Sequence, residues 1–259
     1  MSYGGYLKLD RLLACQHRVS DSHDEMLFII IHQASELWLK ACLFELTRAM
    51  DDVRADRLGP AMKALARIAR IQNNLEQSWE ILATMTPADY SAFRDSLGQS
   101  SGFQSFQYRE LEFRLGNKNP AMVRAHKAAP AIHDALKAVL DNPSFYDLVL
   151  QLLARRGFDL PPSVLDRDWA TPYEPDTKVE AAWAQVYGDP KTHWDLYELA
   201  EKLVDLEFHF QKWRFAHMKT VERIIGFKRG TGGTSGVSYL QKALDLRFFP
   251  ELWTVRTAL

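Results

Sequence analysis

The chain has 259 residues, with 32 Lys and Arg against 33 Asp and Glu, so its formal net charge is −1. This length suffices for one large domain, and 47% apolar with 25% charged residues is typical of a soluble globular protein rather than a disordered one. The balanced charge argues against nucleic acid as a main partner, because phosphate binding needs an excess of basic side chains. Two cysteines, Cys15 and Cys42, are too few for a disulfide framework or a cysteine-based zinc site.

The N-terminal residues, MSYGGYLKLD, contain no apolar signal core. No charge-free apolar stretch reaches the roughly 18 residues that a membrane span needs, and the longest covers only residues 26–35. We therefore expect a soluble, cytoplasmic protein with neither a membrane nor a nucleic acid as partner.

Helical periodicity runs through most of the chain, and strand patterns are nearly absent. Apolar residues three and four positions apart predict a helix over residues 26–50, with Ser22 and Glu25 forming a capping box at its start. The same spacing predicts a second helix over residues 61–82. A fold built from such helices buries their apolar faces against one another.

A third helix is expected to begin at Thr86, whose hydroxyl would cap the backbone in front of Pro87 and Asp89. Between residues 155 and 190 five prolines lie among charged residues. This texture indicates an irregular excursion with short helices on one domain, and not a linker, since helices of similar character resume after it.

The longest helix is expected over residues 192–225, ended by Gly226 in the left-handed conformation that glycine tolerates. A loop with five glycines follows over residues 226–236, and a last short helix is expected over residues 237–246. The sequence thus predicts an all-α, single-domain helical bundle that spans residues 1–259.

Two of the eight histidines, His32 and His217, stand on the apolar faces of long predicted helices. The pattern alone favours core histidines that are hydrogen-bonded to a neighbouring helix, and the alternative is a metal or haem ligand. The sequence lacks the Glu-x-x-His pairs of di-iron bundles, the His-Glu-x-x-His of zinc proteases and the Cys-x-x-Cys-His of covalent haem. A non-covalent b-type haem with one axial histidine remains open, and it would leave the sixth iron position free for a diatomic gas.

Arg94 lies one helical turn after Tyr90, so the guanidinium and the phenol could point to the same place. Together they would suit a small carboxylate, which arginine binds with two parallel hydrogen bonds. The alternative, which the pattern alone favours, is a surface Arg94 beside Asp95 with a half-buried tyrosine.

The glycine-rich loop over residues 226–236 is the most unusual stretch of the sequence. Its glycines allow backbone N–H groups to converge on an anion, and Thr231 adds a hydroxyl, but the loop does not match a P-loop. A binding loop or lid and a plain connector both remain open. The small polar stretch over residues 98–105 is either a turn or a source of donors to a haem propionate.

Five strings carry a resemblance to a known family: YGGYLKLD, HDEMLFIIIHQASELWLK, FRDSLGQSSGFQSFQYRELEFRLGNKNP, WRFAHMKTVERIIGFKRGTGGTSGVSYL and FFPELWTVRT. Together they resemble the bacterial tryptophan 2,3-dioxygenases over essentially the whole chain, most weakly within residues 155–190. The resemblance implies a helical homotetramer with one haem b per subunit. It also implies a reaction that inserts both atoms of O2 across the indole C2–C3 bond of L-tryptophan to give N-formyl-L-kynurenine, the first step of the kynurenine pathway.

The resemblance also implies roles for individual residues. His217 would be the axial ligand of the haem iron, and His32 would be the distal histidine that accepts the substrate's indole N–H. Phe28 would pack on the indole. The other implied contacts are Tyr90 and Arg94 at the substrate carboxylate, Thr231 at its ammonium and carboxylate end, Ser101 and Gly102 in the distal haem pocket, Trp79 at the haem edge, and Tyr3, Tyr6 and Leu7 reaching into a neighbouring subunit's site.

Physical chemistry limits what His32 can do in such a reaction. An indole N–H is an extremely weak acid, so imidazole is poorly matched to remove its proton, and we expect His32 to orient the substrate. Two other functions are kept as alternatives. One is a haem-based gas sensor without turnover, and the other is a related haem enzyme that monooxygenates another aromatic amino acid or indole.

Overall fold

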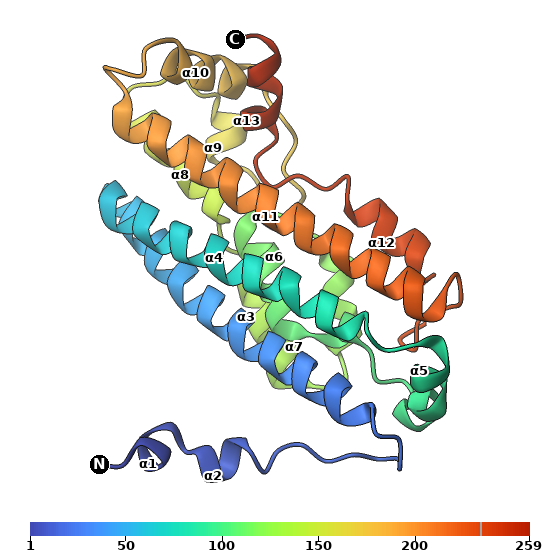
Figure 1. Cartoon of the computed structure of the whole chain (residues 1–259). Helices are drawn as coiled ribbons and strands as arrows, with labels where there is room; N and C mark the ends of the chain where they lie inside the picture. Colours follow the sequence, from blue (N-terminus) through green and yellow to red (C-terminus); the bar gives the residue numbers. More distant parts are fainter. Residues whose placement is uncertain (234) are drawn as a thin grey trace.

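The computed structural model describes residues 1–233 and 235–259, and these residues form α-helices and short 3₁₀ helices without a strand (Figure 1). The predicted all-α class is therefore confirmed. The α-helices are α1 (Tyr3–Leu7), α2 (Leu9–Leu12), α3 (Glu25–Arg54), α4 (Leu58–Leu82), α5 (Pro87–Arg94), α6 (Phe106–Leu115), α7 (Pro130–Leu140), α8 (Phe145–Arg155), α9 (Pro162–Leu165), α10 (Thr177–Gly188), α11 (Trp194–Ile225), α12 (Val237–Ala243) and α13 (Pro250–Thr254). The 3₁₀ helices are η1 (Asp95–Leu97), η2 (Gly102–Gln104), η3 (Pro120–His126) and η4 (Val255–Thr257).

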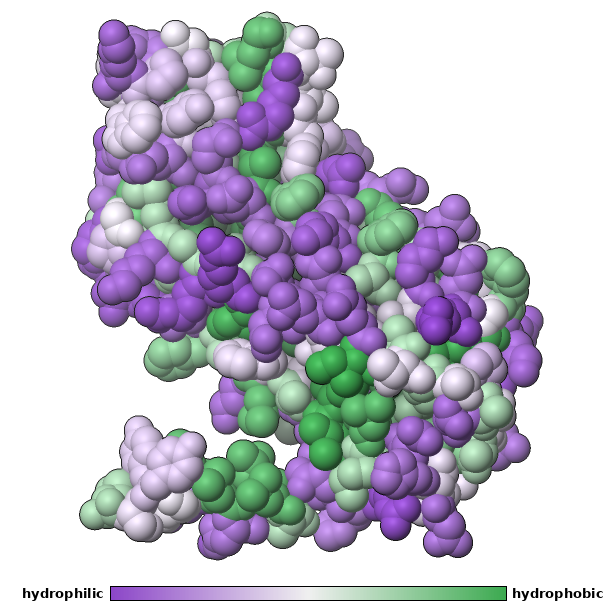
Figure 2. Space-filling model, in the orientation of Figure 1, coloured by the Kyte–Doolittle hydropathy of each residue, from purple (hydrophilic) through white to green (hydrophobic). Residues whose placement is uncertain are grey.

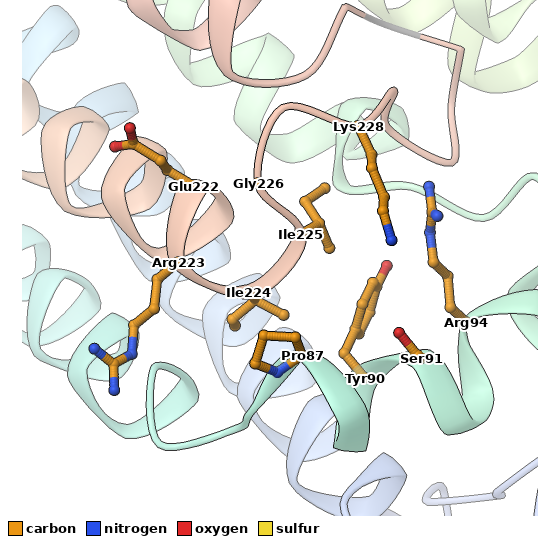
Figure 3. Close-up of a pocket in the computed structure, with 10 residues that line it drawn as sticks. All are labelled: Pro87, Tyr90, Ser91, Arg94, Glu222, Arg223, Ile224, Ile225, Gly226 and Lys228. Atoms are coloured by element: carbon orange, nitrogen blue, oxygen red, sulfur yellow. The ribbon is translucent and has the colours of Figure 1, made fainter.

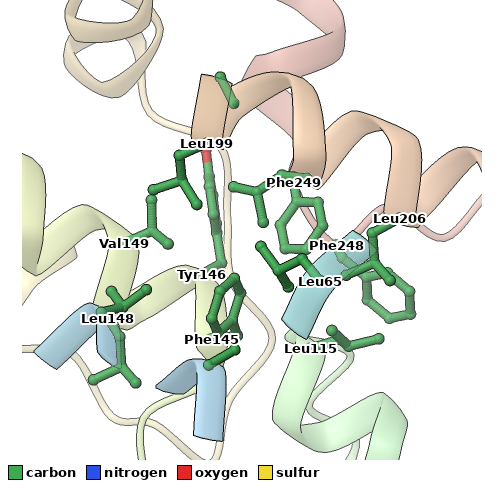
Figure 4. Packing of buried hydrophobic residues seen from close by; sticks show 14 of the residues in the cluster. Leu65, Leu115, Phe145, Tyr146, Leu148, Val149, Leu199, Leu206, Phe248 and Phe249 are labelled. Atoms are coloured by element: carbon green, nitrogen blue, oxygen red, sulfur yellow. The ribbon is translucent and has the colours of Figure 1, made fainter. Parts of the chain in front are cut away.

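Three long helices, α3, α4 and α11, lie side by side and form the frame of the molecule, with α4 in contact with both of the others (Figure 1). Their apolar faces are buried against one another, as at Cys42, Ile68 and Leu203. Figure 4 shows the same core farther along, where Phe248 and Phe249 pack among leucines of α4 and α11. This frame carries His32 on α3, Trp79 on α4 and His217 on α11.

The predicted capping box at the start of α3 is wrong. The helix begins at Glu25, and its N-cap residue makes no side-chain hydrogen bond. Instead, the buried Glu25 carboxylate accepts hydrogen bonds from the backbone N–H groups of Val19 and Ser20, at 2.7 and 2.8 Å. The carboxylate thus satisfies the preceding loop rather than the helix end, which a local sequence pattern does not reveal.

The start of α5 is as predicted. The Thr86 hydroxyl accepts a hydrogen bond from the backbone N–H of Asp89, and the Asp89 carboxylate accepts one from the N–H of Thr86. Pro87 takes the first helical position, where its missing N–H needs no partner. These caps determine where α5 begins, and therefore on which side of it Tyr90 and Arg94 stand.

The proline-rich stretch over residues 155–190 contains α9 and α10, and the latter places Trp183 in the core. The Trp183 indole N–H donates a hydrogen bond to the Tyr146 hydroxyl, which in turn donates one to Glu251 of α13. Helical periodicity did not predict α13. Its short length leaves too few residues to show a repeat.

The long helix α11 begins at Trp194 and ends at Ile225, and Gly226, its C-cap residue, has φ 62° and ψ −140°. Positive φ is as predicted, but ψ lies outside the left-handed helical region, in a conformation open almost only to glycine. The last predicted helix, over residues 237–246, is shorter than expected, since α12 ends at Ala243.

The N-terminal residues 1–24 form an arm that lies apart from the helical body (Figures 1 and 2). The arm is joined to α3 through Gln33, whose side chain accepts a hydrogen bond from Gln16 and donates one to the carbonyl of Cys15. Tyr3 and Tyr6, in α1, are 77% and 71% exposed. Such large aromatic surfaces outside a core are typical of contact surfaces.

Among the described residues, one helix, α3, is long and apolar enough to cross a membrane by length and composition alone. The sequence-based expectation was that no charge-free apolar stretch is long enough to span a membrane. α3 is not charge-free, because it contains Glu36 and Lys40. Only 17% of the most apolar stretch of α3 is buried. Its exposed apolar residues Ile30, Leu37 and Phe44 recur every seventh position on the side opposite the core, and Figure 2 shows apolar residues gathered over α3 beside the arm.

Candidate active site

His217, on α11, packs against two indoles that also contact each other, at 5.7 Å between their centroids. Its ring stacks on Trp79 of α4 with centroids 4.5 Å apart, and Trp213, one turn earlier, packs at 5.5 Å. Burial, together with the nearby His32, lowers the pKa of His217 to about 4. No hydrogen bond to the ring is found in the described part of the chain. His217 is therefore a neutral imidazole near pH 7, which is the form that binds metals.

His32, on α3, faces the same interior region, because its ring packs on Phe28, and Phe28 packs against the cluster that contains Trp79. Its Nδ1 lies 2.7 Å from the carbonyl oxygen of Phe28. Because a carbonyl oxygen only accepts, Nδ1 carries the proton and Nε2 keeps a lone pair. Burial lowers the pKa of His32, which the bond to Phe28 and the charge of Glu36 oppose. His32 thus presents a neutral acceptor.

An aromatic wall stands beside His32. The Phe28 ring lies 4.1 Å from the His32 ring, 6.0 Å from the Tyr90 ring and 5.5 Å from the Phe93 ring. Phe93 is fully buried and holds Phe28 and Tyr90 in place, yet the sequence did not single it out. Phe93 lies three residues after Tyr90 on the predicted helix, and this spacing could have indicated that the two rings share one face. The rings of Phe28, Tyr90 and Phe93 are tilted to one another by 40° to 83°, so they form an apolar surface with ring edges and faces against which an aromatic ring can pack.

One hydrophobic cluster joins these groups with those around His217. Its members come from α3, α4, α5 and α11, and Phe28, Tyr90 and Trp213 pack against it. The buried members are Ile31, Trp79, Leu82, Met85, Phe93 and Ile224. The structure therefore brings the predicted residues Phe28, His32, Trp79, Tyr90 and His217 to one interior region.

Arg94 and Tyr90 line an open pocket of about 290 Å³ at the end of α5 (Figure 3). Arg94 donates a hydrogen bond to the carbonyl of Arg229 at 2.8 Å. Burial raises the pKa of Tyr90, an effect that the charge of Arg94 opposes. The surface ion pair with Asp95, the alternative for Arg94, is not formed; the guanidinium instead points to the glycine-rich loop.

The glycine-rich loop packs against the stretch that contains η2. The Thr231 hydroxyl donates a hydrogen bond to the carbonyl of Ser100 at 2.6 Å. Gly232 lies so close to Ser101 that an added Cβ would stand 2.7 Å from the serine Cβ. Ser101 begins η2 by accepting from the N–H of Phe103, and Gly102 follows it on the surface. The loop is thus a docked cover beside Arg94, and only glycine allows this approach.

Tyr3, Tyr6 and Leu7 are not brought to this pocket. All three are exposed on the N-terminal arm, and the described structure shows no contact between the arm and the α5 pocket. Within one chain they therefore contribute nothing to the site.

Sequence reasoning missed a buried ionic group behind Trp213. Glu112 accepts hydrogen bonds from Tyr108, Arg109 and Arg214, and both ion pairs are almost fully buried. The Tyr108 ring packs 5.2 Å from the Trp213 ring. Charged residues on a helix usually point to solvent, so no local signal identified this group.

Fold and site together describe an all-helical protein with two neutral imidazoles in an aromatic interior and a cationic pocket at its edge. The chain belongs to the tryptophan 2,3-dioxygenase family, because the family's sequence model, described as Tryptophan 2,3-dioxygenase, matches residues 1–259. This confirms the resemblance on which the residue roles rest.

Individual relatives carry the same name. A tryptophan 2,3-dioxygenase of Burkholderia multivorans is 61% identical over 259 residues, which are 100% of this chain and 84% of the relative. One from Erythrobacter litoralis is 61% identical over 100% of this chain and 98% of its own length. One from Bacillus cereus is 58% identical over 100% of this chain and 93% of its own length.

Proposed function

We propose that this protein is a haem-dependent dioxygenase that inserts both atoms of O2 across the indole C2–C3 bond of L-tryptophan and forms N-formyl-L-kynurenine. Family membership over the whole chain supports this activity, as do relatives of about 60% identity that carry the name. The structural observation that carries the proposal is the pair of neutral imidazoles, His32 and His217, which reach one aromatic interior from α3 and α11.

The residues present fit a haem b whose iron His217 would hold. The ring of His217 is neutral and lacks a hydrogen-bond partner within the described chain, and the indole N–H of Trp79 is buried without one. No group of three or more His, Cys, Asp or Glu side chains gathers among the described residues, so a single-nitrogen ligand is the kind of iron site they offer. When bound, haem supplies the activation of O2, which otherwise reacts slowly with an indole.

The protein's own contribution is to hold the substrate in one orientation. Phe28 would pack on the indole, and Nε2 of His32 would accept its N–H, since Nδ1 already donates to a carbonyl. The aromatic wall would exclude water from that end of the substrate. A substrate fixed at its indole and at its amino-acid end has one orientation, whereas a single anchor would leave it free to turn.

The amino-acid end would bind at the α5 pocket. Arg94 now donates to the neutral carbonyl of Arg229, and a carboxylate would replace that carbonyl with a stronger, charge-assisted bond. Tyr90 would add a hydroxyl, and Thr231 would meet the ammonium and carboxylate end from the loop. Ser101 and Gly102, next to the loop, would line the distal side of the haem.

We expect a cytoplasmic homotetramer. The apolar stripe on α3 and the aromatic arm offer large surfaces that a second subunit would cover. Tyr3, Tyr6 and Leu7 would then complete a neighbour's pocket. Sedimentation velocity of the purified protein tests the assembly, and a monomer at micromolar concentration would contradict it.

The deciding experiment supplies reduced, haem-loaded protein with L-tryptophan and ¹⁸O2. N-formylkynurenine that carries two ¹⁸O atoms is the expected product. An oxygenated product that carries only one ¹⁸O atom would favour the monooxygenase alternative. A change in the haem spectrum without any product would favour a gas sensor. Neither alternative is favoured by the names of the relatives.

A further inference from the structure

Lys228 stands at the α5 pocket, although no role has been assigned to it above. It lines the pocket together with Tyr90 and Arg94. Figure 3 shows its ammonium group pointing toward the Tyr90 hydroxyl, with the Arg94 guanidinium rising beside them. Two cationic groups and one phenol therefore meet at one opening.

The backbone at Lys228 is held in place by the loop's own geometry. Gly236 has φ 65°, and a Cβ at that position would stand 2.5 Å from the Lys228 carbonyl oxygen. The two ends of the loop therefore touch at this point. The next residue, Arg229, accepts the hydrogen bond from Arg94 through its carbonyl. Lys228 thus leaves the loop from a position fixed on both sides.

The charges around the pocket are unbalanced. Of its three lining cations, Arg223 donates to the carbonyl of Ala83 and points away, so Arg94 and Lys228 remain at the opening (Figure 3). Its only carboxylate, that of Glu222, pairs with Lys219 at 2.7 Å and points away from Lys228 (Figure 3). Neither Lys228 nor Arg94 forms an ion pair with an acidic side chain in the described part of the chain. A pocket with two cations and no facing carboxylate attracts an anion.

We propose that Lys228 is a second cationic contact for the substrate carboxylate and thereby determines specificity for a free α-carboxylate. This inference rests on the proposed function. A carboxylate has about four acceptor positions, so a guanidinium fork leaves room for an ammonium and a phenol. Since Arg94 belongs to α5 and Lys228 to the loop, a carboxylate between them would join the loop to the helix.

The test measures equilibrium binding to the haem-loaded full chain, from the change in the haem spectrum on titration. Ligands are L-tryptophan and L-tryptophanamide, which lacks the carboxylate charge. We expect Lys228→Met to raise the Kd for L-tryptophan about three- to tenfold and that for the amide less than about twofold, as for an exposed charge-assisted contact. Lys228→Arg keeps the positive charge and should restore much of the affinity for L-tryptophan. Lys242→Met removes a charge from α12 and should change neither Kd.

Two results would overturn the proposal. An unchanged Kd for L-tryptophan in Lys228→Met means that the ammonium does not contact the carboxylate. An equal loss for acid and amide means that Lys228 only stabilises the loop. Product formation by the wild type is measured separately, so that binding with carboxylate selectivity but without N-formylkynurenine would reject the proposed activity and keep the Lys228 contact. A wild type that binds acid and amide equally would reject the contact.

Discussion

The imidazole of His217 and the indole of Trp79 stack with their planes only 16° apart, although they belong to different helices. The stack holds the ring that we assign to the haem iron at the seam between α4 and α11. Trp213 packs on the same ring from its own helix. The orientation of His217 therefore depends on helix packing as well as on its rotamer.

Removing His217 should abolish haem binding, since no second protein ligand is assigned to the iron. We expect His217→Ala to lose the Soret band after haem reconstitution and gel filtration, while circular dichroism remains helical. His209→Ala is the control, because His209 lies on the same helix eight residues before His217 and has no role in the site, and this variant should bind haem normally. A full Soret band in His217→Ala would contradict the ligand assignment.

The buried neutral state of His217 should make the haem-free protein acid-sensitive. Its folded pKa of about 4 lies below the ordinary value of 6.5, so between these pH values the unfolded chain binds more protons. The contribution of His217 to the free energy of unfolding is therefore fully present above about pH 6.5. It falls as the pH approaches 4, by at most about 1.4 kcal/mol per pH unit. Urea unfolding of wild type and His217→Gln across pH 4 to 7.5 tests this, because the variant should show the shallower decline.

His32 is expected to orient the substrate rather than remove its proton. His32→Ala should therefore lower kcat/KM about 10- to 100-fold and leave measurable turnover, as when one hydrogen bond and its orienting effect are lost. Steady-state kinetics and haem content check the result. Complete inactivity with haem and L-tryptophan still bound would show that the imidazole takes part in the chemistry.

Arg94→Lys should raise KM for L-tryptophan about tenfold or more, because an ammonium cannot reproduce the two-pronged guanidinium contact. Arg70→Lys, on the exposed side of α4, is the matched control and should leave KM unchanged. An unaltered KM in Arg94→Lys would remove Arg94 from the carboxylate site.

The buried ionic group behind Trp213 should matter for stability. Glu112→Gln leaves Arg109 and Arg214 buried without a counter-charge, and we expect a loss of about 3 kcal/mol in the free energy of unfolding. Glu110→Gln removes a more exposed ion pair with Arg114 from the same helix and should cost less than about 1 kcal/mol. Equal losses in the two variants would show that burial does not strengthen the Glu112 group.

Local patterns predicted much of the fold and part of the site. Periodicity predicted the long helices, and the Thr86 cap and the glycine at position 226 marked two of their ends. His32 and His217 were visible as polar residues on apolar faces. Their roles, and those of Arg94 and Thr231, came from the resemblance, because the pattern alone favoured structural explanations for the histidines and Arg94 and left the glycine-rich loop open.

Only the tertiary structure decided which distant residues meet. Arg94 contacts the carbonyl of Arg229, far along the chain, and Thr231 contacts that of Ser100. The position of Lys228 over Tyr90 likewise depends on how the loop docks. Helix formation follows largely from spacing and caps within a few residues, so the sequence by itself determined the long helices, although not the short α13. Partners across the chain depend on how those helices pack, which short-range spacing does not specify.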